Sequence, residues 1–306
     1  MKLDFDVVIV GAGVAGMTAA IYLKRANINC CIVEKDAPGG QINKTSTIEN
    51  YPGLIDITGP ELAFQMYEQL QNLNAPYHYG NVLAIEDHKD YKIVKTDQEE
   101  LTCKGVILAI GRVPRKLGIP LEEELSGKGI SWCAICDGPL YKNLNVAVVG
   151  GGNSSLEEAL YLAQLCKKVT IIHRKDTFTA QQYLVQKVQK TKNIKVLFHT
   201  EVVEFKQKDQ KLDGVVLLNN QTHKKRTMKV QGCFLYIGYI PNTQNFSSLG
   251  ILNANGYIQT DDSGRTKVPF IYGAGDVVEK ELYQIVTATS SGAEAATSFI
   301  KDFEHQ

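Results

Sequence analysis

A strand, a glycine-rich turn, a helix and a second strand follow one another twice in this chain of 306 residues. The first copy contains Gly11-Ala12-Gly13-Val14-Ala15-Gly16, and its second strand ends at Glu34. The second copy contains Gly150-Gly151-Gly152-Asn153-Ser154-Ser155 and ends at His173. Both span 23 residues from the first glycine to the end of the second strand. This duplication restricts the fold more than any other feature, because it predicts two separate βαβ units.

Each glycine turn has the residue types that a bound dinucleotide requires. The first glycine allows a tight turn, and the second lets the backbone approach a pyrophosphate. The helix that follows offers free N–H groups and the positive end of its dipole. One such turn is weak evidence, since glycine turns occur in many loops, but two copies in matching context are much stronger. We therefore expect each unit to hold one dinucleotide.

A second, shorter repeat marks the domain boundaries. The apolar run 106–110 is followed by Gly111-Arg112-Val113-Pro114, and the run 234–237 by Gly238-Tyr239-Ile240-Pro241. We interpret these segments as the two crossings between domains. The sequence thus predicts an α/β fold of two Rossmann-like, three-layer nucleotide-binding domains, one inserted in the other. The outer domain would comprise 1–113 and 242–306, and the inserted domain 114–241.

Composition excludes several classes of partner. Lys plus Arg equals Asp plus Glu at 33 each, so the chain has no excess charge with which to hold a nucleic acid or an anionic membrane. No stretch approaches the roughly 18 apolar residues of a membrane span. The seven cysteines are scattered rather than spaced as in a secreted disulfide scaffold. We expect a soluble, cytoplasmic protein whose partners are small molecules or proteins.

The residue that ends the second strand of each unit distinguishes the nucleotides. A carboxylate there accepts hydrogen bonds from an adenosine ribose and repels a 2′-phosphate, so Glu34 favours FAD or NAD in the outer domain. His173-Arg174-Lys175 occupies the same place in the inserted domain, where cationic donors would attract a 2′-phosphate. That arrangement favours NADPH, although the cations could also form an ordinary solvated strand end.

Three further segments fit a flavin in the outer domain. Pro38-Gly39-Gly40-Gln41 forms a tight loop just after Glu34, and a short strand at 270–272 leads into Gly273-Ala274-Gly275-Asp276. Asp276 could bind the ribityl chain, or it could be a turn or capping residue. The small-residue segment 287–296, which follows Gln284-Ile285, would let a helix N-terminus approach the flavin ring, or it could reflect ordinary helix packing.

Cys133-Ala134-Ile135-Cys136-Asp137 lies fourteen residues before the second glycine turn. Two thiols at this spacing can close a small disulfide, to which the nucleotide cofactors can supply electrons. Such a pair can also be half of a zinc site, but the sequence has no second pair to complete one, so we expect no metal. Asp137 could be a catalytic acid or part of a turn with Gly138-Pro139. Cys30-Cys31 begins an apolar strand and is interpreted as packing.

Together these motifs resemble the low-molecular-weight thioredoxin reductases of bacteria, which are class II pyridine nucleotide-disulfide oxidoreductases, and the resemblance covers nearly the whole chain. It implies that Cys133 and Cys136 are the redox disulfide, with Asp137 as its acid. The implied FAD contacts are Gly11, Gly13, Ala15, Gly16, Glu34, Lys35, Gly39, Gly40, Gln41, Asn50, Ala109, Gly111, Asp276, Gln284 and Ile285. The implied NADPH contacts are Gly150, Gly152, Asn153, Ser154, His173, Arg174 and Lys175.

The resemblance also implies a reaction. Electrons would pass from NADPH through FAD to the disulfide and then to thioredoxin or a thioredoxin-like protein. Cys136 would be the sulfur nearest the flavin, and Cys133 the sulfur that attacks the partner. Members of the family are homodimers, and their nicotinamide domain rotates between two states, which would place a hinge at the two Gly-x-x-Pro crossings.

Three departures from the family pattern leave alternatives open. Ser155 replaces the alanine that usually ends the second glycine turn. The family has a His-Arg-Arg-x-x-x-Arg cluster, in which this chain has Lys175 in place of the second arginine and Thr179 in place of the last one. Loss of one charge-assisted contact, worth roughly 1.5–3 kcal/mol, could weaken NADPH binding about ten- to a hundredfold. NADH or reduced ferredoxin could then be the donor.

Pro139-Leu140 replaces two aromatic residues that dock the protein substrate in the family. The motif Cys-Asp-Gly-Pro-Leu resembles the flavoprotein component of alkyl hydroperoxide reductase more closely than it resembles thioredoxin reductases. A peroxiredoxin-type partner is therefore an alternative. A flavoprotein that senses redox state without catalysis is the alternative from another class.

Overall fold

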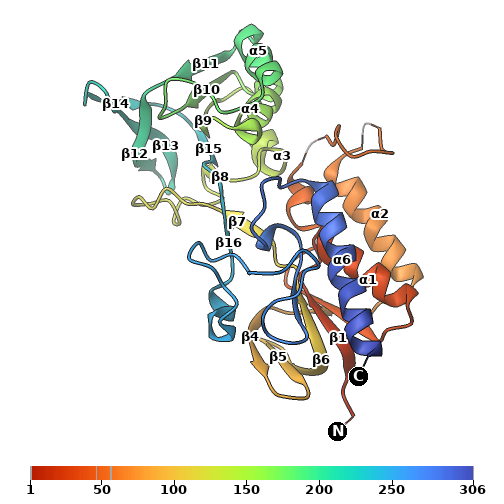
Figure 1. Cartoon of the computed structure of the whole chain (residues 1–306). Helices are drawn as coiled ribbons and strands as arrows, with labels where there is room; N and C mark the ends of the chain where they lie inside the picture. Colours follow the sequence, from red (N-terminus) through yellow and green to blue (C-terminus); the bar gives the residue numbers. More distant parts are fainter. Residues whose placement is uncertain (1, 46, 56, 306) are drawn as a thin grey trace. The chain divides into compact units, whose positions relative to one another are not determined.

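The computed structural model describes residues 2–45, 47–55 and 57–305. The chain divides into two compact units (Figure 1). Unit 1 comprises Met1–Val113 and Ile240–Gln306, and unit 2 comprises Pro114–Tyr239. Each unit contains a sheet built around parallel strands, with helices packed against it, so the predicted α/β class with two dinucleotide-binding folds is confirmed.

The sheet of unit 1 has the order β3-β2-β1-β6-β5-β4, and β17 also pairs with β6. Strands β1, β2, β3, β6 and β17 run parallel, whereas β4, β5 and β6 form an antiparallel meander. The order changes direction beside β1, which is where open α/β sheets bind ligands at the carboxyl ends of their strands. The bounds are β1 (Phe5–Val10), β2 (Cys30–Glu34), β3 (Tyr77–Tyr79), β4 (Val82–Asp87), β5 (Lys92–Thr96), β6 (Glu100–Leu108) and β17 (Ile271–Gly273).

Two helices from opposite ends of the chain cover one face of this sheet. Helix α1 (Val14–Arg25) and helix α6 (Ile285–Glu304) share a buried apolar cluster with β1 and β2. They approach so closely that a Cβ at Gly292 would collide with the Ala15 carbonyl oxygen. Part of the small-residue segment 287–296 therefore serves ordinary helix packing. The remaining elements are α2 (Gly59–Asn72), η1 (Gly40–Lys44), η3 (Gln244–Leu249) and η4 (Gly275–Val277).

Unit 2 has three layers around the parallel sheet β11-β10-β9-β15-β8. Helices α4 and α5 pack on one face, and the antiparallel meander β12-β13-β14 covers the other. The sheet strands are β8 (Ile130–Ser131), β9 (Asn145–Gly150), β10 (Lys168–Ile172), β11 (Ile194–Leu197) and β15 (Gly232–Tyr236). The other elements are α3 (Ala134–Asp137), η2 (Gly138–Tyr141), α4 (Asn153–Leu165), α5 (Gln182–Lys190), β12 (Thr200–Lys208), β13 (Lys211–Asn219) and β14 (Lys225–Met228).

The two connecting segments pair with each other. Strand β7 (Arg112–Pro114) and strand β16 (Tyr239–Pro241) form a two-stranded sheet. Each follows a glycine with positive φ, 59° at Gly111 and 105° at Gly238, a conformation that residues with a Cβ rarely adopt. Within the described part of the chain, none of the helices combines the length and the apolar character needed to cross a bilayer.

Candidate functional site

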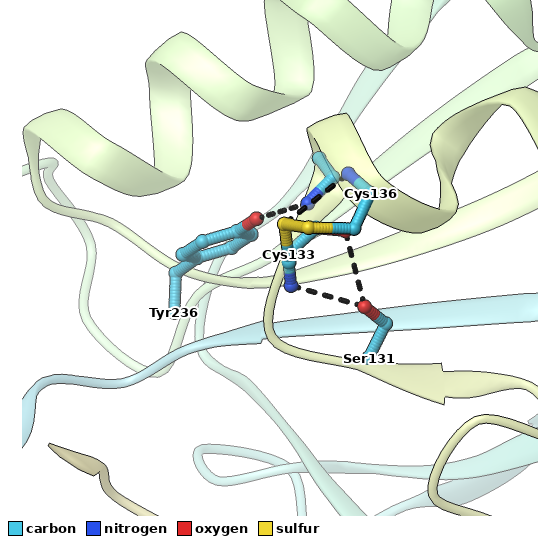
Figure 2. The surroundings of a disulfide bond; sticks show 5 residues. Ser131, Cys133, Cys136 and Tyr236 are labelled. Carbon is cyan, nitrogen blue, oxygen red and sulfur yellow. Dashed lines mark hydrogen bonds between the residues drawn. A yellow bond between two sulfur atoms is a disulfide. The ribbon is translucent and has the colours of Figure 1, made fainter. Parts of the chain in front are cut away.

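Cys133 and Cys136 form a disulfide at the start of the short helix α3 (Figure 2), with an S–S distance of 2.05 Å. The sulfurs are bonded to each other, as the redox interpretation requires. The N–H of Cys136 donates to Cys133 Sγ at 3.2 Å. Cys133 is buried, whereas Cys136 is exposed, so the two sulfurs differ in accessibility.

Two residues that sequence reasoning missed hold the turn before α3. Ser131 Oγ accepts from the Cys133 N–H at 3.0 Å and lies 3.2 Å from the Cys133 carbonyl oxygen, to which it donates. Tyr236 Oη accepts from the Ala134 N–H at 2.9 Å (Figure 2). Ser131 ends β8 and Tyr236 ends β15, and these strands are neighbours in the sheet. No local pattern marks such residues, because they meet the helix only through sheet pairing.

Asp137 is the last residue of α3 and is partly buried. Its N–H donates to the Cys133 carbonyl oxygen at 3.1 Å, which closes the turn. Asp137 also lies within electrostatic range of the Tyr141 phenol, whose pKa is raised by burial and then by the Asp137 charge. The residue therefore takes part in a turn, and its role as the acid of the redox pair stays a prediction.

The other five cysteines are buried thiols. Burial raises the pKa of Cys30 and Cys103 to about 12 and the pKa of Cys166 to about 11, and it raises the pKa of Cys31 and Cys233 still further. Since the thiolate is the reactive form, these side chains are inert. Cys30 and Cys31 lie in β2, which agrees with a packing role.

The first glycine turn leaves the N-terminal end of α1 open. Gly11 has φ of 103°, and a Cβ there would lie 2.6 Å from the Ala109 carbonyl oxygen. Gly13 caps α1 without a side-chain hydrogen bond, and a Cβ on it would meet nothing within 4 Å. The turn therefore presents helix N–H groups to open space, which fits a pyrophosphate.

Glu34 supports this turn as well as offering a ribose contact. Its Oε2 accepts from the Ala12 N–H at 2.8 Å, and its Oε1 accepts from the N–H groups of Lys35 at 2.8 Å and Asp36 at 2.9 Å. A carboxylate has about four acceptor positions, so Oε2 keeps one for a hydroxyl group. This remaining acceptor position fits a hydroxyl group of the adenosine ribose of FAD.

The loop after Glu34 folds back onto the turn. The Gly39 N–H donates to the Ala12 carbonyl oxygen at 2.8 Å. A Cβ added to Gly40 would lie 3.3 Å from Gly13 Cα, so a side chain there would crowd the turn. The predicted residues Gly13, Gly39 and Gly40 are thus brought together into one backbone cradle.

A second group of predicted residues gathers around Arg112. Its Nη2 lies 3.1 Å from Asp276 Oδ2, and its carbonyl oxygen accepts from Gln41 Nε2 at 2.9 Å. The guanidinium also lies over the Tyr283 ring, 3.5 Å from its centroid. Asp276 therefore pairs with a cation instead of acting only as a turn residue. The sequence pattern places Arg112 only in a crossing between domains, and no motif marks Tyr283.

Helix α6 fixes the remaining flavin-side positions. Ser291, buried in α6 and not predicted, accepts from the Gly275 N–H at 2.8 Å. Asn50 Nδ2 donates to Gln284 Oε1 at 2.9 Å, at the residue that caps α6. Every predicted FAD contact lies in unit 1, in loops and helix starts that follow β1, β2, β6 and β17 or begin α6.

The second glycine turn has the same design. Gly150 has φ of 146°, and a Cβ there would collide with the Tyr236 carbonyl oxygen. Gly152 caps α4 without a side-chain hydrogen bond. Asn153 Oδ1 accepts from the Gln181 N–H at 2.8 Å, so this predicted NADPH contact also holds a neighbouring loop. Ser154 is exposed beside it. The open helix end fits a second pyrophosphate.

His173 packs underneath this turn. Its ring is buried against Gly151 and contacts the rings of Phe178 and Phe198, and its Nε2 lies 3.0 Å from the Thr177 carbonyl oxygen. Burial lowers the pKa of His173, and the nearby cations lower it further. The structure therefore leaves Arg174 and Lys175 as the exposed cations of the strand end.

Thr179, which replaces an arginine of the family pattern, forms hydrogen bonds to the second glycine turn instead. Its N–H and its Oγ1 both donate to the Gly151 carbonyl oxygen, at 2.9 Å and 3.2 Å. Its Oγ1 is the nearest atom to a Cβ built on Gly152, at 3.9 Å. The position is therefore beside the glycine turn but carries no charge.

Comparisons with known proteins agree with this geometry. The profile of the pyridine nucleotide-disulphide oxidoreductase family matches residues 5–292. The thioredoxin reductase of Bacillus subtilis (strain 168) is 44% identical over 294 residues, which cover 96% of this chain and 93% of that protein. The crystal structure of Lactococcus lactis thioredoxin reductase in the FR conformation has a TM-score of 0.96 at 42% identity, covering 99% of this chain and all of that one. The T. acidophilum thioredoxin reductase has a TM-score of 0.93 at 34% identity, with the same coverage.

Proposed function

Since the chain belongs to the pyridine nucleotide-disulphide oxidoreductase family, we propose that it is a thioredoxin reductase, which passes electrons from NADPH through FAD and the Cys133–Cys136 disulfide to thioredoxin. The observation that carries the proposal is this disulfide, set beside the second of two glycine cradles in one chain. FAD, when bound, supplies the two-electron chemistry that links a nicotinamide to a disulfide. The enzyme uses FAD and NADPH as its cofactors.

The residues around the disulfide perform the sulfur chemistry. Two electrons and one proton convert the S–S bond into one thiol and one thiolate. The Cys136 N–H, which points at Cys133 Sγ, stabilises a thiolate on Cys133. We assign Cys133 as the sulfur that attacks thioredoxin and Cys136 as the sulfur that receives electrons. Because Cys133 is buried, it must become accessible before it reacts.

Thiol–disulfide exchange with the protein partner transfers two electrons in two steps. The Cys133 thiolate attacks one sulfur of the partner's disulfide, forms a mixed disulfide and expels the other sulfur as a thiolate. Cys136 then attacks Cys133, which restores the disulfide and releases the partner as a dithiol. Asp137, beside the pair, holds a proton for the departing thiolate. Two electrons leave this enzyme and two enter the partner.

The donor is assigned to NADPH on the exposed pair Arg174 and Lys175. These cations are the groups suited to a 2′-phosphate at the end of β10. Anaerobic mixing of the oxidised holoenzyme with NADPH or NADH, followed by flavin absorbance, tests the donor. Bleaching by NADPH at lower concentration supports the proposal, whereas bleaching by NADH alone, or only by reduced ferredoxin, contradicts it.

Steady-state turnover with thioredoxin tests the acceptor. An enzyme that is reduced by NADPH but leaves thioredoxin oxidised, while turning over a peroxiredoxin-type disulfide, would overturn the assignment of the partner. An enzyme whose flavin is reduced but which turns over neither substrate would point to redox sensing.

We also propose that the protein is a homodimer in the cytoplasm. The exposed apolar side chains Phe64 on α2 and Val286 on α6 support a protein contact on unit 1. The five buried cysteines that remain thiols support a reducing compartment. Light scattering coupled to size exclusion tests the dimer, and a monomer mass at micromolar concentration would contradict it.

A further inference from the structure

Helix α4 presents one acidic residue on the face that packs against the redox helix. A Cβ on Gly138, just after α3, would lie 3.2 Å from both Leu162 Cδ2 and Tyr161 Cε1, and 3.4 Å from Leu165 Cδ1. Residues three, four and seven positions apart share a helix face, so Glu158 lies on this same face, one turn nearer the glycine cradle. The redox turn and the acid therefore share one helix surface.

Glu158 is a half-buried residue, and one oxygen of its carboxyl group has no hydrogen-bond partner in the described chain. Its Oε2 is buried and makes no hydrogen bond. Such an oxygen is costly to bury when charged, and burial raises the pKa of Glu158 to about 8, with the neighbouring Glu157 charge adding to the effect. A buried carboxyl oxygen without a hydrogen-bond partner is a feature of functional sites rather than of ordinary helix packing.

Tyr236 links this carboxyl to the disulfide. Its Oη accepts from the N–H of Ala134, the first residue between the two cysteines (Figure 2). Burial raises the pKa of Tyr236, and the Glu158 charge is the next largest cause, which places the carboxyl within electrostatic range of the phenol. Tyr236, Tyr161 and Leu165 pack in the same apolar cluster as Ala134 and Leu162.

We propose that Glu158 is a positioning residue of the redox site, whose protonation state acts through Tyr236 on the reactivity of the reduced Cys133–Cys136 pair. With Glu158 neutral, the Tyr236 oxygen accepts from the Ala134 N–H, as it does in the structure. An ionised Glu158 draws the hydroxyl proton toward itself and adds a negative charge near the sulfurs, which disfavours the thiolate. The inference rests on the proposed function only in taking this pair as redox-active.

Besides Glu158 and Tyr236 themselves, three titratable groups in the described chain shift the pKa of one or the other. Glu157 comes from α4, Asp137 from α3 and Tyr239 from β16, and each raises the pKa of Glu158 or Tyr236. Asp137 is the one that must be separated from Glu158, because both are acids near the same helix. The exposed Glu157 offers a matched control, since it is the adjacent residue on the same helix.

The test uses the whole protein reduced with dithiothreitol, freed of reductant, and alkylated with iodoacetamide between pH 6 and 10. Mass spectrometry follows the peptide that contains Cys133 and Cys136. We expect the alkylation rate of the wild type to show a second inflection near pH 8 as pH is varied. Above that pH, the rate should lie about three- to tenfold below the curve for a single titrating thiol, which is the effect of one added charge in a partly buried site. Glu158→Gln should remove the inflection, and Glu157→Gln should keep it at slightly lower pH.

Tyr236→Phe should weaken the inflection while Glu158 still titrates. An inflection that persists in Glu158→Gln, or that is absent from the wild type, overturns the proposal; one unchanged in Tyr236→Phe overturns the link through Tyr236. If Glu158→Gln fails to fold, Glu158→Met is the second neutral variant. Because alkylation needs neither NADPH nor thioredoxin, its outcome is separate from that of the turnover assays, which test the proposed function.

Discussion

Arg112 and Asp276, 164 residues apart in sequence, form an ion pair of 3.1 Å within unit 1. Their side chains are only 15% and 28% exposed, so the pair is shielded from solvent more than a surface salt bridge. The pair ties the segment after β6 to the segment after β17, two places where flavin contacts are predicted. Loss of the ion pair should therefore weaken flavin binding before it disturbs the rest of the fold.

Arg112→Ala should lower the amount of flavin that co-purifies. It removes the ion pair with Asp276 and the stacking on Tyr283, and the expected cost is about 1–3 kcal/mol in stability of unit 1. The ratio of flavin to protein absorbance after gel filtration measures the first effect, and thermal unfolding the second. Lys116→Ala, which breaks the exposed pair with Glu123, is the control and should change neither. Full flavin retention in Arg112→Ala would show that the pair is not part of the flavin site.

Cys136→Ser should abolish turnover of thioredoxin by a factor of at least about 1,000, because the disulfide can no longer form. NADPH should still bleach the flavin, since the cofactor sites are intact. Cys166→Ser, at a buried thiol that no proposed step uses, should retain turnover. If the Cys136 variant reduces thioredoxin at the wild-type rate, the catalytic assignment is wrong.

Thr179→Arg should lower the KM for NADPH about tenfold and leave the KM for NADH nearly unchanged. The variant adds a cation beside the second glycine turn, and the backbone N–H still donates to Gly151. Thr179→Val, which loses the Oγ1 contact without gaining a charge, separates the two effects. An equal change for both nicotinamides would show that the position does not face the 2′-phosphate.

The Glu158→Gln variant should be more stable than the wild type at high pH, and this difference in the free energy of unfolding should grow as pH rises. The Glu158 pKa is about 8 in the folded chain and near 4.5 when unfolded. Between these values the folded state holds a proton that the unfolded state has released, so the wild type loses stability with rising pH across this window and levels off above pH 8. The advantage of the glutamine variant should grow over the same range to about 2–4 kcal/mol. Urea unfolding at pH 5, 7 and 9 measures it, and a constant difference would contradict the buried-acid assignment.

Local signals were sufficient for much of this molecule. The two glycine turns, their flanking strands and helices, and the Cys-x-x-Cys pair were all recognisable, because strand and helix periods and glycine backbone requirements are written within a few residues. Residues whose roles depend on packing between distant segments were not recognisable from the sequence. Ser131, Ser291 and Tyr236 look like ordinary strand or helix residues, and only their partners reveal what they do.

His173 shows the limit most clearly. Its place at the end of the second strand predicted a cationic nucleotide contact, but the ring packs under Gly151, and burial lowers its pKa. Whether it touches NADPH stays a prediction. A strand-end position specifies where a side chain starts, whereas the neighbours Phe178 and Phe198 specify which way it turns.

The order of residues alone determined that the chain makes two dinucleotide cradles with a thiol pair beside the second, since each is a contiguous pattern governed by backbone geometry. The tertiary structure decided which distant groups meet: Arg112 with Asp276, Tyr236 with the Ala134 N–H, and the Glu158 carboxyl with the face of α4 that packs against the redox turn. The reason is that burial and hydrogen bonding between remote segments depend on how strands pair and helices pack, and no short stretch of sequence records those partners.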